Sequence, residues 1–360
     1  MRHERIDGMT LSEALGETGA EHDRTGSFPE PAFDILRSLG HVGAPPLDAS
    51  RAVDLFRLLA EIGRGDLSTG RIFEGHVNTL LLIRTHGTPS QWARCDALAR
   101  DGGLFGVWNT DAPDDPLRLE GTTLQGKKNF ASGVDGLSQA IVTVTGPAGR
   151  QMLLVPLDGL PVDRSWWTPT GMHASGSHIV DFSGTRIQPD WLLGAPDAYI
   201  GQPWFSAGAM RFASVQVGGM HAVFDEALAH LVKTRRDGDP YQKQRLARMG
   251  MAVETGYAWL DRAGAAWAKA AEPDAPAGSD DALIALANGF RSVVEALALA
   301  VLEEAERAVG AAGFIAPHPL ERRMRDLRTY LRQPNPDGAL AGLGTAIAAG
   351  QWAPGQRHDC

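Results

Sequence analysis

The chain has 360 residues, of which 43% are hydrophobic and 21% are charged, a composition typical of a folded globular protein rather than a disordered one. Its formal net charge of -9 argues against sequence-independent binding to nucleic acid, which requires a broad excess of Lys and Arg. The two cysteines, Cys95 and Cys360, predict neither a disulfide framework nor a metal site. The sequence has no signal-like apolar segment at its start and no run of about 18 uninterrupted apolar residues, so we expect a cytoplasmic protein without a membrane partner.

Three regions of different pattern follow one another along the chain. Residues 1–100 are predicted to be helical, since apolar residues such as those of residues 50–65 recur at helical spacing before glycines end the pattern. Residues 101–195 contain short β-rich runs separated by Gly- and Pro-containing turns, which predicts an antiparallel, barrel-like β-domain. Residues 196–360 return to helical spacing. Apolar stripes at 210–231 and 283–301 imply two long antiparallel helices, whose connection includes the Pro- and Gly-containing loop 271–280. The predicted fold is of the α+β class.

Two segments of the β-rich region combine residues that could serve a ligand. LFGVWNTDAP (104–113) is an apolar strand that ends in Trp108 and Asn109, a flat ring and an amide. GKKNFASG (126–133) leaves a strand in small residues, which allows a planar, polar group to approach the backbone N–H groups closely. Taken alone, each segment is better explained as a strand end or a turn.

Two further segments lie in the last helical region. RAVGAAGF (307–314) closes a long helix with small residues, which is typical of a helix stop but would also let a ligand or a partner chain lie against the backbone. Residues 322–332 hold five arginines together with Asp326. Such a charged run is usually a solvated face, with the acid paired locally.

Taken together and in this order, the four segments resemble the acyl-CoA dehydrogenase family of flavoproteins. The most specific similarity is ungapped: RAVGAAGFIAPHPLERRMRD (307–326) resembles the family's Q-x-F-G-G-x-G-F, followed by P-x-E and then R-D. DRTGSFPEPAFDILRSLG (23–40) and GMHASGSHIVDFSGTRIQPDWLLG (171–194) are also similar to family segments. The resemblance covers nearly the whole chain. It implies an N-terminal helical domain (1–100), a middle antiparallel β-domain (101–195) and a C-terminal four-helix bundle (196–360).

The resemblance implies bound FAD and assigns residues to it. Gly310 and Ala311 match a segment that contacts the FAD of a neighbouring subunit, so a homodimer or homotetramer is expected. In the same segment, Arg307 stands where the family has glutamine. Arg235 falls near the family's arginine for the FAD pyrophosphate, but the Phe-Gly that usually follows is missing, and APDDPLRLEG replaces the Gly-Ala-Gly-Ser loop after the first flavin strand. The positions that would cradle the flavin ring are Val107, Trp108, Asn109, Phe130, Ala131 and Ser132.

The catalytic base of the dehydrogenases has no counterpart at either of its customary positions. Dehydrogenation of an acyl thioester needs a carboxylate to remove the α-proton while a hydride leaves to the flavin. The family's glutamate lies nine residues after the arginine of the R-D pair, where this chain has Pro334, and the alternative position before Arg211 holds Met210. Asp337 is the nearest candidate acid in the sequence.

Three functions therefore stay open from the sequence. The preferred one is FAD-dependent α,β-dehydrogenation of an acyl thioester of CoA or of a carrier protein, with Asp337 as a weak candidate for the base and an electron-transfer partner. The second is a flavin-dependent monooxygenase of the same fold, which acts on another small molecule and needs a flavin-reductase partner. The third is a silent flavin- or acyl-binding protein. His173, His178, Trp166 and Trp167 are interpreted as structural or packing residues.

Overall fold

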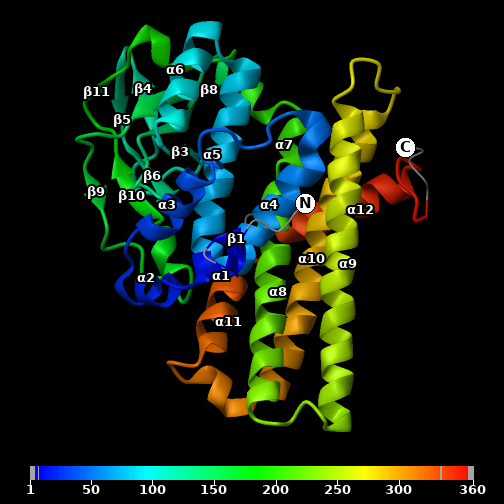
Figure 1. Ribbon diagram of the computed structural model, residues 1–360. Helices are drawn as coiled ribbons and strands as arrows, with labels where there is room; N and C mark the ends of the chain where they lie inside the picture. Colours follow the sequence, from blue (N-terminus) through cyan, green and yellow to red (C-terminus); the bar gives the residue numbers. More distant parts are fainter. Residues whose placement is uncertain (1–4, 7, 333–334, 356–360) are drawn as a thin grey trace.

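The computed structural model describes residues 5–6, 8–332 and 335–355. Figure 1 shows a β-rich part on one side and a set of long helices on the other, with α4 (Ala52–Gly65) and α5 (Leu67–His86) between them. The order of helical, β-rich and helical regions agrees with the sequence, and the fold class is confirmed.

The N-terminal region consists of a two-stranded ribbon and six helices. Thr10 and Thr88 begin two of these helices with reciprocal hydrogen bonds to Glu13 and Gln91, an arrangement that satisfies the first free N–H groups of each helix. Asp66 separates α4 from α5 and caps α5 by accepting a hydrogen bond from Thr69 N at 2.8 Å. The remaining elements are β1 (Arg5–Ile6), β2 (Met9–Thr10), α1 (Leu11–Gly16), α2 (Gly19–Thr25), α3 (Glu30–Ser38) and α6 (Pro89–Arg100).

The β-rich part contains three small sheets. One has the order β12-β8-β7-β3, another β6-β10-β9, and the third β11-β5-β4. The prediction of an antiparallel domain is wrong for one pair, because β3 runs parallel to β7, with Trp108 opposite Val142. The chain passes through three intervening strands before it returns beside β3, which permits this parallel pairing. The strands are β3 (Phe105–Trp108), β4 (Arg118–Glu120), β5 (Thr123–Gln125), β6 (Lys127–Ala131), β7 (Gln139–Gly146), β8 (Gly149–Pro156), β9 (Val162–Asp163), β10 (His178–Asp181), β11 (Thr185–Arg186) and β12 (Leu192–Leu193).

The C-terminal region is built on three long helices that lie side by side (Figure 1). The two predicted apolar stripes lie in α8 and α10, and residues 271–278 join α10 to α9, a third long helix that the apolar spacing did not reveal. Because α9 runs back between them, α8 and α10 run in the same direction (Figure 1), so the prediction of an antiparallel pair is wrong. Helix α8 packs against α4 as well as α10, and glycine permits this close crossing, since a Cβ on Gly218 would clash with the Ala60 carbonyl oxygen. The helices are α7 (Trp204–Ala207), α8 (Ala209–Lys233), α9 (Pro240–Ala270), α10 (Ser279–Val309), α11 (Pro319–Tyr330) and α12 (Pro336–Ala348).

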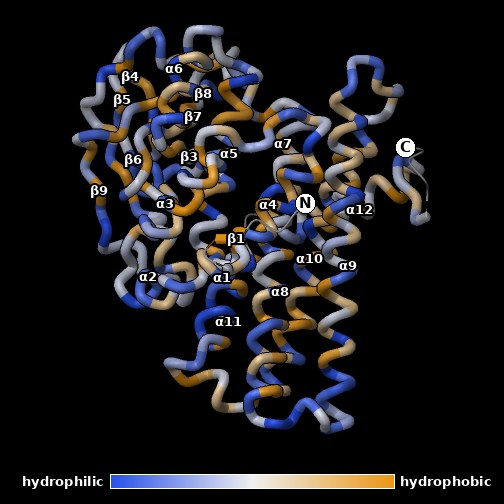
Figure 2. The backbone as a smooth tube through the Cα atoms, viewed as in Figure 1, coloured by the Kyte–Doolittle hydropathy of each residue, from blue (hydrophilic) through white to orange (hydrophobic). Residues whose placement is uncertain are grey.

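Two helices of this region have unusual polarity. By length and hydropathy alone, Ser279–Phe314 could cross a membrane, but half of its apolar window is buried inside the fold, as in the core helix of a bundle. Helix α11 is instead largely hydrophilic (Figure 2), although its N-terminal half packs beside α8 in the interior. Its arginines therefore meet other parts of the chain rather than solvent alone.

Helix α5 connects the β-rich part to the rest of the molecule. The backbone N–H of Phe105 in β3 donates to His76 Nδ1 at 3.3 Å, and His76 Nε2 donates to the Val42 carbonyl at 2.9 Å. Complete burial lowers the pKa of His76 to about 4, so this side chain is neutral at physiological pH and serves as a structural link. The residues of α5 that face α8 and α11 are thereby held close to the ends of the sheet strands.

Candidate functional site

Two of the predicted flavin-binding segments meet where β3 and β6 end. The Trp108 side chain is buried, and its Nε1 donates a hydrogen bond to the Ser132 carbonyl at 3.3 Å. The buried Ser132 hydroxyl lies 2.8 Å from the Ser177 hydroxyl in the segment before β10. Ala131 is fully buried and Val107 is half-buried. The fold therefore brings these predicted residues together and holds the backbone of residues 131–133 rigidly.

The side chain of Asn109 is engaged inside the β-rich part. Its Oδ1 accepts hydrogen bonds from Thr143 Oγ1 at 2.8 Å and from Arg150 Nη1 at 3.3 Å. Its carbonyl accepts from Lys128 Nζ at 3.1 Å, and this fully buried ammonium also pairs with Asp111 at 2.6 Å. Burial lowers the pKa of Lys128, while the Asp111 carboxylate opposes that shift. Asn109 thus stabilises the sheet ends, and a ligand would meet its backbone rather than its amide.

Phe130 and two tryptophans form an exposed aromatic surface beside these strand ends. Phe130 has a φ of 52° and is 48% exposed, and its ring lies edge-on to Trp166 with centroids 4.9 Å apart. Trp167 lies 6.1 Å from the same ring, and its Nε1 donates to the Met172 carbonyl at 3.3 Å. The tryptophans do pack, as predicted, but they also leave a flat apolar surface open to solvent, with Trp166 37% exposed.

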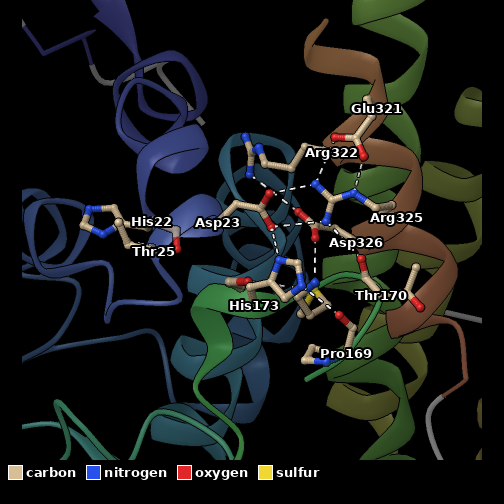
Figure 3. Close-up of polar contacts among 12 residues, drawn as sticks. His22, Asp23, Thr25, Pro169, Thr170, His173, Glu321, Arg322, Arg325 and Asp326 are labelled. Carbon is tan, nitrogen blue, oxygen red and sulfur yellow. Dashed lines mark hydrogen bonds and ion pairs between the residues drawn. The ribbon is translucent and has the colours of Figure 1, made fainter. Parts of the chain in front are cut away.

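The arginine-rich helix α11 is anchored by ion pairs to distant parts of the chain (Figure 3). Arg322 Nη1 donates to Asp66 Oδ1 at 2.7 Å and lies 3.6 Å from Asp326. Arg325 Nη2 donates to Asp23 Oδ2 at 2.7 Å. We call Asp23, Asp66, Arg322, Arg325 and Asp326 the anchor network. It ties α11 to α2 and to the start of α5, so Arg322 and Arg325 hold the helix in place.

The anchor network also positions the loop that carries the aromatic surface. Asp326 Oδ1 accepts from Met172 N at 2.6 Å, and Arg325 Nη1 donates to the Thr170 carbonyl at 3.0 Å. His173 bridges Asp23 and the Pro169 carbonyl, at 3.0 and 2.7 Å (Figure 3). This supports the structural role predicted for His173. Burial raises the pKa of Asp326 to about 6, against the opposing effect of Arg322.

A cavity of about 580 Å³ lies along α11 between this loop and the end of α10. Thr170 belongs to its wall and stands four residues after Trp166, so the cavity and the aromatic surface share one loop. The lining contains more arginine than acid. It consists of Thr170, Glu306, Phe314, Glu321, Met324, Arg325, Arg328, Thr329 and Arg332.

A second group of buried charges lies where α5, α8 and the end of α11 meet. Glu74 Oε2 accepts from Arg71 Nη1 at 2.9 Å, and Glu74 Oε1 lies 3.5 Å from Arg211 Nε. Arg211 Nη2 donates to Asn78 Oδ1 at 2.6 Å. The Tyr330 hydroxyl is buried and is coupled electrostatically to Arg71 and Glu74. We call Arg71, Glu74, Asn78, Arg211 and Tyr330 the inner cluster.

Sequence reasoning missed the members of the inner cluster on α5. Arg71, Glu74 and Asn78 are spaced by three and four residues, which places them on one face of a helix whose other positions are mostly apolar. This spacing of polar residues within an otherwise apolar helix was the feature of the sequence that could have revealed the cluster. Arg211 was noticed only as the neighbour of Met210, which is fully buried and apolar.

Other predicted site residues lie at the far end of the bundle or on its surface. Arg235 follows α8, and Gly310 and the exposed Ala311 follow α10. The last turn of α8 contacts the residue that begins α11, with His230 Nδ1 2.9 Å from His318 Nε2. In Figure 1 this end of the bundle points away from the β-rich part. Arg307 pairs with Glu303 at 2.6 Å. Contact of these residues with a neighbour's flavin stays a prediction.

No contact that the structure describes links the candidate base, Asp337, to the inner cluster. Asp337 is exposed in the first turn of α12, a helix that packs against α10. Pro334, at the usual position of the glutamate, lies outside the described residues. Neither feature places a free carboxylate beside Phe130 or Ser132.

Comparison with known proteins identifies relatives of this architecture. Residues 200–331 match the family model described as "Acyl-CoA dehydrogenase, C-terminal domain". The chain is 23% identical to a dibenzothiophene monooxygenase of Rhodococcus qingshengii, over 95% of this chain and 92% of the relative. It is 28% identical to L-evernosamine nitrososynthase of a Micromonospora species, over 87% of this chain and 82% of the relative.

A solved structure extends the comparison to three dimensions. FMN-bound TdsC, from Paenibacillus sp. A11-2, superposes with a TM-score of 0.83 at 18% identity, covering 96% of this chain and 97% of that one. At this identity the likeness establishes the fold. Both the helical regions and the β-rich part are therefore arranged as in proteins of the acyl-CoA dehydrogenase fold.

Proposed function

We propose that this chain, whose residues 200–331 match the acyl-CoA dehydrogenase C-terminal domain and which has the fold of that family, is a flavin-dependent monooxygenase that transfers one oxygen atom of O₂ to a small molecule. The observation that carries the proposal is the similarity, over nearly the whole chain, to dibenzothiophene monooxygenases. The two base positions of the dehydrogenases hold Pro334 and Met210 in this chain, which agrees with the proposal. Of the functions open from the sequence, the second is therefore preferred to acyl thioester dehydrogenation.

Neither Glu74 nor Asp337 is well placed as the base of a dehydrogenase, which also favours the monooxygenase. Glu74 is the buried acid of the inner cluster, and its two oxygens face the guanidinium groups of Arg71 and Arg211. A general base for an α-proton needs a carboxylate oxygen that can reach the substrate. Asp337, exposed on α12, is poorly placed for this role.

The residues at the ends of β3 and β6 fit a flavin. The exposed ring of Phe130 offers a face or edge to a planar ring system, and the bonds from Ser132 to Trp108 and Ser177 hold the adjoining backbone in place. The cavity beside Thr170 has the volume usual for cofactor and ligand sites. When bound in reduced form, a flavin supplies the two electrons that O₂ needs to yield an oxygenated product and water.

The chemical form of the flavin is a separate part of the proposal. The sequence resemblance implies FAD, whereas the neighbour TdsC holds FMN. Denaturing the purified protein and separating the released flavin by chromatography identifies the nucleotide directly. We propose a flavin reductase as the partner that delivers electrons, and a homodimer or homotetramer in which Gly310 and Ala311 face a neighbouring subunit, with a cytoplasmic location.

The decisive experiment supplies the protein with reduced flavin from an NADH-dependent reductase, in the presence of ¹⁸O₂. Substrates include dibenzothiophene and indole, compounds that the relatives' names and complexes mention. We expect a product that contains one ¹⁸O atom and that forms only when both the reductase and this protein are present. A parallel anaerobic mixture with short and long acyl-CoA is expected to leave the oxidised flavin spectrum unchanged.

The other two functions predict different results in the same pair of assays. Bleaching of the flavin by an acyl-CoA without oxygen would establish a dehydrogenase and overturn the proposal. A protein that binds flavin but neither bleaches nor incorporates ¹⁸O would be a silent binding protein. Failure to bind any flavin would exclude both enzymes.

A further inference from the structure

Three serine hydroxyls beside the flavin-binding segment form a hydrogen-bonded chain. The Ser132 hydroxyl lies 2.8 Å from that of Ser177, and the Ser177 hydroxyl lies 2.9 Å from that of Ser175. All three residues are buried, with exposures of 8% for Ser132, 3% for Ser177 and 1% for Ser175. The hydroxyl chain therefore runs inward from the end of β6 to the turn that precedes β10.

This hydroxyl chain has one hydrogen more than it uses. Each hydroxyl has one hydrogen to donate, so three hydrogens serve the two links between the serines. Within the described residues, these two links are the hydrogen bonds that the three hydroxyls make. A buried hydroxyl hydrogen without an acceptor is unfavourable, so the third hydrogen calls for an acceptor on a bound group.

The Ser132 end of the hydroxyl chain is the end that meets a ligand. Ser132 is the most exposed of the three serines, and it stands two residues after Phe130, whose ring belongs to the exposed aromatic surface. Ser175, at the other end, lies in a turn that packs against α2 and α5. The hydrogens are therefore directed from Ser175 to Ser177 and on to Ser132, and the third hydrogen leaves from Ser132.

The backbone around the serines holds the hydroxyl chain in place. Gly133 N donates to the Ser175 carbonyl at 2.7 Å, which joins the two segments next to the Ser132 side chain. Met172 N, in the same turn as Ser175, donates to Asp326 of the anchor network at 2.6 Å. The turn is thus fixed by the sheet segment on one side and by α11 on the other.

We propose that Ser175 and Ser177 are positioning residues, which orient the Ser132 hydroxyl so that it donates its hydrogen to an acceptor atom of the bound flavin ring. This assignment rests on the flavin site proposed above, to which Ser132 belongs. Without the two serines behind it, the Ser132 hydroxyl would rotate among several partners, and the bond to the ring would weaken. Ser175 and Ser177 are not among the residues that the sequence assigned to the flavin.

Flavin binding tests the assignment without any turnover. The purified protein, freed of flavin, is titrated with FMN and with FAD, and the change in flavin fluorescence gives the affinity. Ser132→Ala removes the donor and is expected to weaken binding roughly 3- to 10-fold, the usual effect of one hydrogen bond. Ser177→Ala leaves the donor but not its orientation, and it should weaken binding about 2- to 3-fold. The double variant should bind as Ser132→Ala does, because Ser177 acts through Ser132.

The reduction potential of the bound flavin separates this orientation from ordinary packing. A hydrogen bond to the ring stabilises the oxidised and reduced forms unequally, so its loss shifts the potential. Ser177→Ala should shift it in the same direction as Ser132→Ala but less, whereas Ser177→Thr, which keeps a hydroxyl, should retain the wild-type value. Ser183→Ala is the matched control. It removes an exposed hydroxyl that accepts from Gly126 N at the opposite end of β6, and it should change neither affinity nor potential.

Three results would overturn the assignment. These are additive losses of affinity in the double variant, a wild-type potential in Ser177→Ala, or a changed substrate KM in Ser132→Ala with unchanged flavin affinity, which would place the hydroxyl on the substrate. If Ser177→Ala does not fold, Ser175→Ala breaks the hydroxyl chain one link further back and should give a smaller shift in the same direction. Variants that behave as expected in a protein that incorporates no ¹⁸O would refute the monooxygenase and leave the serine assignment standing, so the two failures are distinguishable.

Discussion

The anchor network and the inner cluster both include residues of α11, and they differ in how far the protein alone satisfies their hydrogen bonds. In the anchor network, Arg322 and Arg325 face three aspartates, and Asp326 in addition accepts a backbone N–H. In the inner cluster, two arginines share the carboxylate of Glu74, with Arg211 Nε 3.5 Å from it, and the Tyr330 hydroxyl has no partner among the described residues.

This difference separates a complete structural network from a less complete one. A buried charge is tolerated when it is paired and its hydrogen bonds are made, and such a network holds segments in one arrangement. The anchor network meets that condition and joins α2, α5, α11 and the loop at Met172. The inner cluster meets it less fully, because the buried Tyr330 hydroxyl has no partner among the described residues.

The largest expected effect is the loss of the anchor network's central arginine. In Arg322→Met, the carboxylates of Asp66 and Asp326 lose their buried partner, and the free energy of unfolding should fall by about 3–5 kcal/mol. Urea denaturation measures the change. The matched control is Arg84→Met, which removes an exposed pair with Asp48 and should cost less than about 1 kcal/mol. Equal effects of the two substitutions would show that the network does not anchor the fold.

A smaller effect concerns the pH dependence of Asp326. Its pKa is raised from 3.8 to about 6, so between these values the folded protein binds a proton that the unfolded chain does not. Lowering the pH from 7 to 5 should therefore add about 1 kcal/mol from this group to the free energy of unfolding. Asp326→Asn should lack that contribution. Urea unfolding of both proteins at the two pH values gives the difference, and identical pH dependence would contradict the assigned burial effect.

A still smaller effect on stability is expected in the inner cluster. Tyr330→Phe removes a hydroxyl that makes no hydrogen bond within the described residues, so without ligand the free energy of unfolding should change by less than about 0.5 kcal/mol. Thermal and urea unfolding of the ligand-free protein measure this. A loss above about 2 kcal/mol would mean that the hydroxyl has a partner, and the contrast between the two groups of charges would disappear.

No effect is expected at the acid that the sequence offered as a base. Asp337→Asn should change neither oxygen incorporation nor the anaerobic flavin spectrum with acyl-CoA, because this residue is exposed on α12. Steady-state turnover is the measurement. A loss of about 100-fold or more, the usual contribution of a general base, would place Asp337 in the chemistry and favour the dehydrogenase instead.

The sequence was sufficient for features that local patterns encode. Apolar spacing predicted the long helices α8 and α10, but not α9 between them. The segments around Trp108 and Ser132 were identified from their residues and from the family resemblance. The arginines of α11 were interpreted only in outline, as a charged run that is usually a solvated face with Asp326 paired locally. Arg322 does lie near Asp326, but its closest carboxylate is Asp66, 256 positions earlier. No spacing rule on one helix can predict such a partner.

The sequence by itself determined the fold class, the family resemblance and the emptiness of both customary base positions, because these depend on residue identity and on periods within single elements. Only the tertiary structure decided which buried charges are complete. Arg71 and Glu74 on α5, Arg211 on α8 and Tyr330 at the end of α11 come together through the packing of three helices. Charge balance and hydrogen-bond satisfaction are properties of that junction and of no segment alone.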